Sequence, residues 1–193
     1  MKNSNLIIFA GLPGTGKSTA CRIFVDKLKN LNRDIFFFDV DQLAKDTKFF
    51  SDINPDDQRE FYARRKEFYN LQSERLKELL MAHQFVVMDA VFEKRELRKI
   101  IYSGARDTNA IINIIMTVCP KDIVEKRILA DINHKLGNPQ KRLFIYQQTE
   151  KHLQSINLFE KYSNKLHIRH ISTDINTDEQ IQELITDEFL FQS

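Results

Sequence analysis

The sequence predicts an α/β fold of three layers, in which helices cover both faces of a five-stranded parallel sheet. The first observation behind this prediction is that five short apolar runs alternate with patterns of helical spacing. The second is that these runs are almost uninterrupted by polar residues, as residues 111–116 illustrate, which is typical of strands buried on both faces. The third is a glycine-rich loop, residues 11–18, that joins the first run directly to the first helical pattern.

The five expected strands define one edge of the sheet at which a ligand site is expected. They cover residues 6–10, 34–38, 85–88, 110–117 and 165–171. In such a sheet the carboxyl ends of the parallel strands lie at one edge, and ligands bind there. Polar residues follow the first three strands at that edge, namely loop 11–18, Asp39 with Asp41, and Asp89.

The loop after the first strand carries the most specific signal in the chain. Its sequence, Gly-Leu-Pro-Gly-Thr-Gly-Lys-Ser from Gly11 to Ser18, matches the pattern G-x-x-x-x-G-K-[ST] at every fixed position. In this pattern the backbone amides cradle phosphates, the lysine reaches the outer phosphates and the serine hydroxyl holds Mg²⁺. The sequence therefore predicts a nucleotide-binding loop, to which these residues contribute: Gly11, Pro13, Gly14, Thr15, Gly16, Lys17, Ser18 and Thr19.

The helix that follows this loop is expected to begin near Lys17, so the positive end of its dipole faces the same phosphates. Between residues 19 and 31 apolar side chains recur on one helical stripe. The stripe comprises Ile23, Phe24, Leu28 and Leu31. This order of strand, loop and helix is the context that the phosphate-binding pattern requires.

Length and composition limit the classes of protein that the chain can represent. Its 193 residues suit a single domain that spans residues 1–193. Lysine and arginine total 29 against 27 for aspartate and glutamate, and the resulting charge of +2 gives no global attraction to nucleic acid or membrane. The two cysteines, Cys21 and Cys119, are expected to be core thiols. Because no apolar stretch approaches the length of a membrane span, we expect a soluble, cytoplasmic protein whose oligomeric state the sequence does not determine.

Two carboxylates follow the second expected strand. Alternation along an extended chain turns Asp39 and Asp41 the same way. We expect Asp41 to act as the base in phosphoryl transfer because it lies furthest beyond the strand, and Asp39 either to support the water shell of a metal ion or to orient nearby backbone. The alternative is that Asp41 is the N-cap of a helix over residues 42–48, and the two roles can coexist.

Asp89 follows the apolar run 85–88 and has the form of a Walker B carboxylate. Beside an established phosphate loop, such a residue binds the shell of Mg²⁺, so Ser18 and Asp89 are the predicted metal site. The histidines and cysteines show no spacing typical of a zinc site, and no serine nucleophile elbow is present. Zinc and hydrolytic chemistries are therefore disfavoured.

A long helix is predicted after residues 54–57, where asparagine, proline and two aspartates form a helix-start pattern. Its expected buried residues are Phe61, Phe68, Leu71 and Leu79. A basic cluster near its start consists of Arg59, Arg64, Arg65 and Lys66. Solvation and substrate binding explain this cluster equally well. The aromatic residues between 61 and 69 favour core packing over stacking on a nucleobase or sugar.

Residues 132–143 are predicted to form a movable lid, because they are polar and basic and are broken by Gly137 and Pro139. Helical patterns flank them at residues 122–130 and 143–158. Arg127, on the helix before the lid, is placed to stabilise charge on a transferred phosphoryl group. An ion pair of Arg127 with Asp131, one helical turn away, explains it equally well. Further lid candidates for phosphate contact are Lys135, Lys141 and Arg142.

Together these features resemble the small P-loop kinases of the AAA_33 type, which include gluconate-kinase-like enzymes, chloramphenicol phosphotransferase, zeta toxins and the kinase domain of polynucleotide kinase. The resemblance covers essentially the whole chain and is carried by Gly11–Ser18, Asp39–Asp41, Val86–Ala90, and Val118–Pro120 leading to Glu125–Arg127. It implies a P-loop NTPase fold with strand order 2-3-1-4-5 and a helical lid. It also implies that Asp41 is the acceptor base and that Arg127 contacts the phosphates.

The chain departs from this family at two positions. Relatives that act on polynucleotides often have an arginine three residues after the base, where this chain has Ala44 followed by Lys45. Many relatives have a second basic residue four positions after the arginine near the lid, where this chain has Asp131. Nucleic acid is therefore a possible acceptor but not the favoured one.

The sequence thus predicts a kinase that uses ATP and Mg²⁺ to phosphorylate a hydroxyl group of a small molecule. The expected catalytic residues are Lys17, Asp41 and Arg127. One alternative is a kinase for the 5′-hydroxyl of a polynucleotide or nucleoside. A second, from another class of protein, is a nucleotide-binding switch or interaction module that phosphorylates no acceptor.

Overall fold

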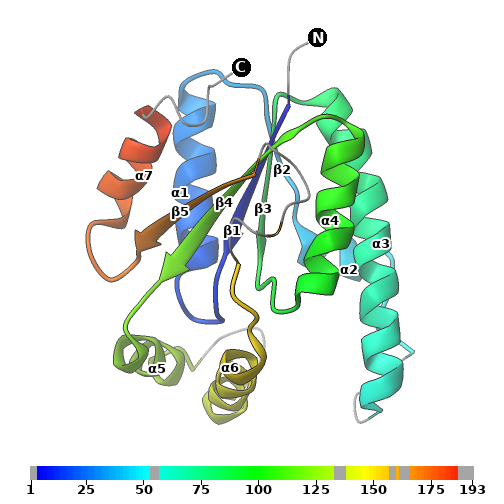
Figure 1. Cartoon of the computed structure of the whole chain (residues 1–193). Helices are drawn as coiled ribbons and strands as arrows, with labels where there is room; N and C mark the ends of the chain where they lie inside the picture. Colours follow the sequence, from blue (N-terminus) through cyan, green and yellow to red (C-terminus); the bar gives the residue numbers. More distant parts are fainter. Residues whose placement is uncertain (1–3, 53–56, 133–137, 157–159, 161–165, 187–193) are drawn as a thin grey trace.

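The computed structural model of the chain describes residues 4–52, 57–132, 138–156, 160 and 166–186, and its centre is a parallel sheet (Figure 1). The strands are β1 (Asn5–Ala10), β2 (Ile35–Phe37), β3 (Phe85–Ala90), β4 (Ile111–Val118) and β5 (Leu166–Ser172). They form a five-stranded sheet in the order β2-β3-β1-β4-β5, and every neighbouring pair is parallel. The predicted fold class and strand order are therefore confirmed.

The strands begin and end within one or two residues of the predicted positions, and the largest difference is in β3. This strand continues past Met88, because Asp89 and Ala90 keep the register of β1 and lie opposite Phe9 and Ala10. Asp89 was expected to follow the strand, but it is the next-to-last residue within it. Its side chain is thus fixed by the sheet rather than by a loop.

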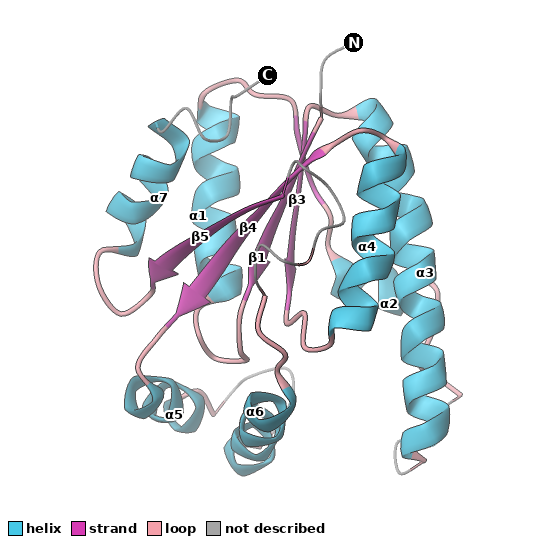
Figure 2. Ribbon diagram, viewed as in Figure 1, coloured by secondary structure: helices cyan, strands magenta, loops and turns pink. Residues whose placement is uncertain are grey.

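Helices cover both faces of the sheet, which gives the three predicted layers (Figure 2). On one face, α1 (Lys17–Asn30) and α7 (Thr177–Thr186) pack on a core that includes Phe9, Phe24 and Ile181. On the other face, α3 (Gln58–Ala82) and α4 (Arg95–Asp107) pack on a core that includes Leu76 and Ile101. None of the described helices is long and apolar enough to cross a membrane.

The stripe predicted on α1 is correct except at its end. Phe24 and Leu28 are fully buried and Ile23 is partly buried, but Leu31 is 53% exposed. Leu31 is the C-cap, and its backbone leaves the helical path before its side chain can reach the sheet. The rest of the stripe holds α1 against the sheet and thereby fixes the position of its first turn.

Two further helices, α5 (Lys121–Ala130) and α6 (Pro139–His152), lie beyond the carboxyl ends of the strands (Figure 1). Of the predicted lid, residues 133–137 lie outside the described residues. The expectation of an irregular segment is wrong for residues 138–143, which begin α6. The Asn138 side chain accepts hydrogen bonds from the backbone of Gln140 and Lys141, and Pro139 occupies the first turn, so this proline starts a helix rather than breaking one.

The long helix α3 begins directly after a capping residue. Asp57 is the N-cap, and its carboxylate accepts hydrogen bonds from the backbone N–H groups of Arg59 and Glu60. The start pattern predicted at residues 54–56 lies outside the described residues. Phe68 and Leu79 are buried as predicted, but Phe61 is 41% exposed because it lies at the rim of a cavity.

Candidate nucleotide and acceptor site

The glycine-rich loop connects β1 to α1 in a conformation that its glycines permit. Gly14 and Gly16 have φ angles of 79° and 85°, in the left-handed region that residues with a Cβ atom rarely adopt. A Cβ atom on Gly14 would lie only 3.0 Å from side-chain carbons of Val124 and Ile128 on α5. Gly16 is the N-cap of α1, so the unpaired amides of the first helical turn open toward the loop.

Lys17 begins α1 and folds back over this loop. Its ammonium group donates a hydrogen bond of 2.9 Å to the carbonyl oxygen of Leu12. Burial lowers the pKa of Lys17 from its ordinary value of 10.5 to about 8, and the negative charge of Asp89 opposes that shift only in part. The lysine is therefore a desolvated cation beside a single neutral acceptor, and a phosphate group would stabilise its charged form strongly.

The other predicted loop residues have different surroundings. Thr15 is buried, and its hydroxyl donates to the Leu12 carbonyl at 2.8 Å and pairs with Thr117 at 2.9 Å, so its side chain supports the loop from beneath. Gly11 is also buried, against Thr117, whereas Thr19 is exposed and lines a cavity. Pro13 lines a second cavity on the far side of the loop.

Ser18 and Asp89 are brought together as predicted, although they are separated by most of the first half of the chain. The Ser18 hydroxyl donates a hydrogen bond of 2.6 Å to Oδ2 of Asp89. One hydroxyl and one carboxylate suit Mg²⁺, which in nucleotide sites takes its remaining ligands from phosphates and water. Within the described part of the chain, no group of three or more His, Cys, Asp or Glu side chains is placed to hold a metal unaided. The residues therefore fit a metal ion that arrives with a nucleotide.

The prediction for Asp39 and Asp41 rested on an extended backbone, and this premise is wrong. The chain leaves β2 at Phe37, and α2 (Val40–Asp46) begins three residues later. Asp39 is the N-cap of α2 and accepts a hydrogen bond of 2.9 Å from the backbone of Gln42, whereas Asp41 lies in the first turn. The proposed N-cap role thus belongs to Asp39. Both side chains nevertheless line the same cavity, because this short helix follows β2 after only two residues and lies against β3.

Two cavities meet over the glycine-rich loop. The β5-side cavity has a volume of about 790 Å³ and extends from the loop toward Thr173 and Thr177. The α3-side cavity has a volume of about 550 Å³ and extends toward the aromatic face of α3. They share the side chains of Lys17, Ser18, Asp41 and Asp89, as well as Gly14, Ile128 and Arg142. Four of the polar residues predicted for phosphoryl transfer, Lys17, Ser18, Asp41 and Asp89, therefore lie at their junction, whereas Thr19, Asp39 and Arg127 line only the β5-side cavity.

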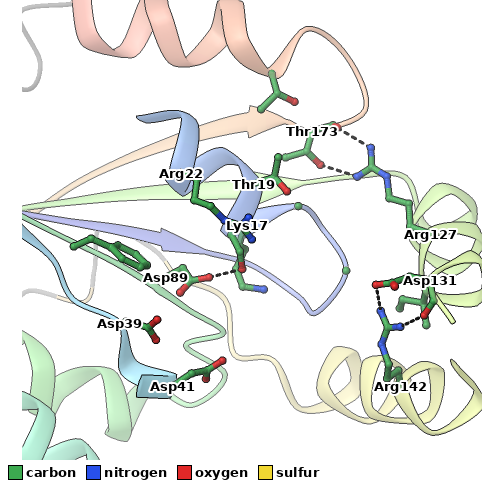
Figure 3. A pocket seen from close by; sticks show the side chains of 16 residues that line it. Lys17, Thr19, Arg22, Asp39, Asp41, Asp89, Arg127, Asp131, Arg142 and Thr173 are labelled. Carbon is green, nitrogen blue, oxygen red and sulfur yellow. Dashed lines mark hydrogen bonds and ion pairs between the residues drawn. The ribbon is translucent and has the colours of Figure 1, made fainter. Parts of the chain in front are cut away.

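Arg127 and Arg142 enter the β5-side cavity from α5 and α6 (Figure 3). The Arg127 guanidinium donates to the backbone oxygen of Thr173 at 2.8 Å and to its hydroxyl at 3.3 Å. Asp131, the alternative partner considered for Arg127, instead accepts from Arg142 through its backbone oxygen at 2.6 Å and its carboxylate at 3.4 Å. Both arginines thus border the cavity while held by partners at its edge.

The basic cluster predicted on α3 divides between the cavity and the surface. Arg65 lines the α3-side cavity and forms an ion pair of 2.9 Å with Glu93. Arg64 turns away and pairs with Asp52, while Arg59 and Lys66 are exposed. Helical periodicity separates these neighbours, because successive side chains on a helix point in different directions. One member of the cluster therefore lies in the site, and the solvated interpretation suits the others.

Arg98 is fully buried and has a structural role. It forms an ion pair with Glu160, which is 1% exposed, and donates to the backbone oxygens of Phe92 and Gln154 at 2.7 and 3.0 Å. Arg95 lines neither cavity. Arg98 thus joins the segment after β3 to the segment after α6, and this fixes the loop that carries Glu93.

Sequence reasoning missed several residues that line the cavities. Thr173 follows β5, and its hydroxyl donates to the backbone oxygen of Thr15 at 2.6 Å. Its place directly after an apolar strand was a signal that could have found it. Glu93 and Gln72 line the α3-side cavity, and no motif marks them. The remaining polar residues missed in the β5-side cavity are Arg22 and Thr177.

The sheet order, the loop and the converging carboxylates define a P-loop nucleotide-binding protein. The profile of the AAA_33 family, described as an AAA domain, matches residues 6–131. The chain therefore belongs to the AAA_33 family, which confirms the resemblance seen in the sequence. No match to the chain was found among curated proteins.

Solved structures of several kinases share this fold. The APS kinase CysC of Mycobacterium tuberculosis, in complex with AMPPNP and APS, matches with 19% identity, coverage of 100% of both chains and a TM-score of 0.68. A sugar kinase from Janibacter sp. HTCC2649 matches with 12% identity, coverage of 95% of this chain and 93% of that chain, and a TM-score of 0.63. A gluconokinase from Sinorhizobium meliloti 1021 matches with 15% identity, coverage of 100% and 98%, and a TM-score of 0.58. At these identities the similarity shows the fold.

Proposed function

We propose that the protein is an ATP-dependent kinase that transfers the γ-phosphoryl group to a hydroxyl group of a small molecule. The observation that carries this proposal is the junction of two cavities at Lys17, Ser18, Asp41 and Asp89. ATP would occupy the β5-side cavity, with its phosphates on the loop, and the acceptor would occupy the α3-side cavity. The similar structures of an APS kinase, a sugar kinase and a gluconokinase support this class of reaction.

In the proposed reaction the acceptor oxygen forms a bond to the γ-phosphorus while the bond from that phosphorus to the bridging oxygen breaks, and ADP leaves. Asp41 takes the proton of the acceptor hydroxyl. Its position supports this role, because it lines both cavities and thus borders the path between donor and acceptor. Asp39 is engaged by the backbone of Gln42, so it is the poorer candidate for the base.

Charge on the transferring group would be stabilised by Lys17 and by the amides at the start of α1. Lys17 would exchange its hydrogen bond with Leu12 for the phosphates, because burial leaves its ammonium group poorly solvated and an anionic partner would stabilise the charge. Ser18 and Asp89 would hold Mg²⁺, which when bound neutralises charge on the phosphate oxygens. Arg127 would turn from Thr173 toward the phosphates and add a planar cation to the same region.

The first test supplies γ-labelled ATP and Mg²⁺ to the protein together with separate pools of sugars, nucleosides, 5′-hydroxyl oligonucleotides and drug alcohols. Label in a small-molecule pool is the expected result. Label in oligonucleotides, together with a steep loss of acceptor binding as salt rises, would establish the nucleic-acid alternative instead. Label only in free phosphate would contradict the kinase proposal and favour a nucleotide-dependent switch.

A further inference from the structure

We propose that the acceptor is an uncharged alcohol that carries an aromatic or similarly flat apolar group, and that Glu93 selects it against anionic acceptors. This inference rests on the proposed function and specifies the occupant of the α3-side cavity. Three observations carry it: an aromatic wall, a set of charges that are already paired, and a buried anchor that fixes Glu93.

The aromatic wall is formed by one face of α3. Phe61, Phe68 and Tyr69 all line the cavity, and the spacing of seven residues between the two phenylalanines places them two turns apart on the same face. Phe49 and Phe50 support this wall from behind, with ring centroids 5.0 and 5.2 Å from that of Phe68. Rings arranged in this way offer a rigid surface against which a flat apolar group can pack.

Phe61 shows that this wall is incomplete without an occupant. Its side chain is 41% exposed although it belongs to the aromatic cluster, with its ring centroid 6.0 Å from that of Phe50. Val40 and Val91 face the same space, as does Ile145 from α6. A cavity of about 550 Å³ lies within the range of sites for small organic ligands, which are mostly apolar with a few polar groups.

The part of the chain that the structure describes leaves no cation in reserve in the α3-side cavity for an anionic acceptor. Among the described lining residues the cations are Lys17, Arg65 and Arg142, against the anions Asp41, Asp89 and Glu93. Arg65 pairs with Glu93 at 2.9 Å, and Arg142 is bound to Asp131. Lys17 lies on the phosphate loop. A carboxylate or phosphate on the acceptor would therefore meet Glu93 without a cation of its own.

An uncharged acceptor is not repelled by Glu93, and the α3-side cavity offers it polar partners. The carboxylate of Glu93, the amide of Gln72 and the hydroxyl of Thr149 all line the cavity. Gln72 is 3% exposed, so its amide is held in a nearly dry environment. These groups can orient a hydroxyl-bearing molecule by hydrogen bonds while the phenylalanines hold its apolar part.

Glu93 is fixed rigidly enough to discriminate between acceptors. Its exposed fraction is only 14%, and the residue before it, Phe92, accepts a hydrogen bond of 2.7 Å from the buried Arg98. The Arg65 guanidinium donates a hydrogen bond to the carboxylate of Glu93. Glu93 is therefore a preorganised negative group, and preorganisation makes its repulsion of a second anion effective.

The first experiment separates a small-molecule extract of the source organism into anionic, cationic and neutral fractions, and divides the neutral fraction by retention on a phenyl column. Each fraction is incubated with the protein, γ-labelled ATP and Mg²⁺. The expected result is label in the neutral, phenyl-retained fraction. Label mainly in the anionic, cationic or unretained fraction would overturn this inference while leaving the proposed kinase function intact. Label in no fraction, with MgATP still bound in calorimetry, would contradict the proposed function itself.

The second experiment compares Glu93→Gln with Glu67→Gln. The first substitution frees the Arg65 guanidinium inside the cavity, so labelling of the anionic fraction should rise about tenfold relative to the neutral fraction. Glu67 also contacts an arginine of α3, Arg64 at 3.9 Å, but lies outside both cavities, so its substitution should leave the ratio unchanged. An unchanged ratio in Glu93→Gln would overturn the selective role of Glu93.

The third experiment tests the aromatic wall with Phe61→Leu, for which Phe144→Leu is the control. Phe144 is also exposed, at 60%, but lies in neither cavity. Phe61→Leu should raise several-fold the amount of the neutral fraction needed for half-maximal labelling, with no change for ATP. If the two variants behave alike, Phe61 does not contact the acceptor and the inference of an aromatic group falls.

Discussion

The β5-side and α3-side cavities differ in how the chain builds them. The largest contiguous part of the first is the loop and the start of α1, so consecutive residues present backbone amides and Lys17 to one point. The second is assembled from α3, the segment after β3 and α6, which are far apart in the chain. Under the proposed function, the donor site would therefore depend largely on one contiguous motif, whereas the acceptor site would depend on packing between distant helices.

The largest expected effect tests the boundary between the two cavities. In Asp41→Asn the side chain keeps its shape but can no longer take a proton, so acceptor phosphorylation should fall by about 10²- to 10⁴-fold. MgATP binding measured by calorimetry should remain close to that of the wild type. Asp46→Asn is the matched control, since Asp46 lies at the other end of α2, bonded to Gln42, and lines neither cavity. Loss of nucleotide binding in Asp41→Asn would show that the two cavities are not functionally distinct.

Lys17→Ala tests phosphate binding by the glycine-rich loop, at which both cavities meet. Removal of the cation that faces the phosphates should lower kcat by roughly 10²- to 10³-fold, as loss of one charge-stabilising group does in other enzymes. Calorimetry should also show weakened MgATP binding, which separates this variant from Asp41→Asn. The control is Lys29→Ala, because Lys29 is an exposed lysine in the last turn of the same helix. If Lys17→Ala retained full activity, the loop would not hold the transferred phosphate.

Glu160→Gln tests the support of the α3-side cavity. The substitution leaves the buried Arg98 guanidinium without its anionic partner, which should lower the free energy of unfolding by about 3–5 kcal/mol. Denaturant titration measures this loss. In protein that remains folded, acceptor phosphorylation should decline more than MgATP affinity, because Arg98 anchors the segment that carries Glu93. Equal loss of both would mean that the anchor stabilises the molecule without favouring one cavity.

The sequence predicted features that depend on local residues better than features that depend on packing between distant segments. The glycine-rich loop was predicted residue by residue, because its pattern depends on local backbone chemistry. The sheet was predicted with small errors at strand ends, because buried parallel strands are long apolar runs. In contrast, Glu93 and Gln72 were missed, since only the packing of α3 against neighbouring segments brings them to the site.

The incorrect predictions have a similar physical origin. Nothing in the sequence marked Arg98 as buried, because a charged residue is normally exposed, but the buried Glu160 pairs with it inside the protein. Pro139 was interpreted as part of an irregular lid, although proline is equally suited to the first turn of a helix. In both cases one residue type fits two environments, and only distant parts of the chain decide between them.

A smaller effect is expected from Arg127→Ala. If this arginine donates to the phosphates in the reacting complex, its loss removes a charge-assisted hydrogen bond of about 1.5–3 kcal/mol and should lower kcat by roughly tenfold to hundredfold. Lys126→Ala is the control, because Lys126 pairs with Asp122 on the outer surface of α5 and lines neither cavity. Equal kinetics for the two variants would leave Arg127 with the structural role that its bonds to Thr173 indicate.

The smallest predicted effect is the pH dependence of nucleotide binding, which tests the contribution of Lys17. The pKa of Lys17 is lowered to about 8 in the folded protein, so its ammonium group loses its proton as pH rises through that value. Bound phosphates stabilise the charged form, and binding above pH 8 must therefore take up a proton. The affinity for MgATP should fall by up to about tenfold per pH unit above pH 8, and calorimetry in buffers of different ionisation enthalpy should detect the proton.

The lowered pKa of Lys17 has the opposite consequence for the stability of the ligand-free protein, which should rise with pH where nucleotide affinity falls. Between pH 8 and 10.5 the unfolded chain keeps the Lys17 proton while the folded chain has released it, so the unfolded state binds more protons. The contribution of Lys17 to the free energy of unfolding should therefore increase with pH across this window, while nucleotide affinity decreases. Lys17→Met removes the titrating group and should abolish both trends, whereas Lys29→Met should abolish neither. A pH dependence of binding that survives in Lys17→Met would assign it to another group and would remove Lys17 as the cation that meets the phosphates.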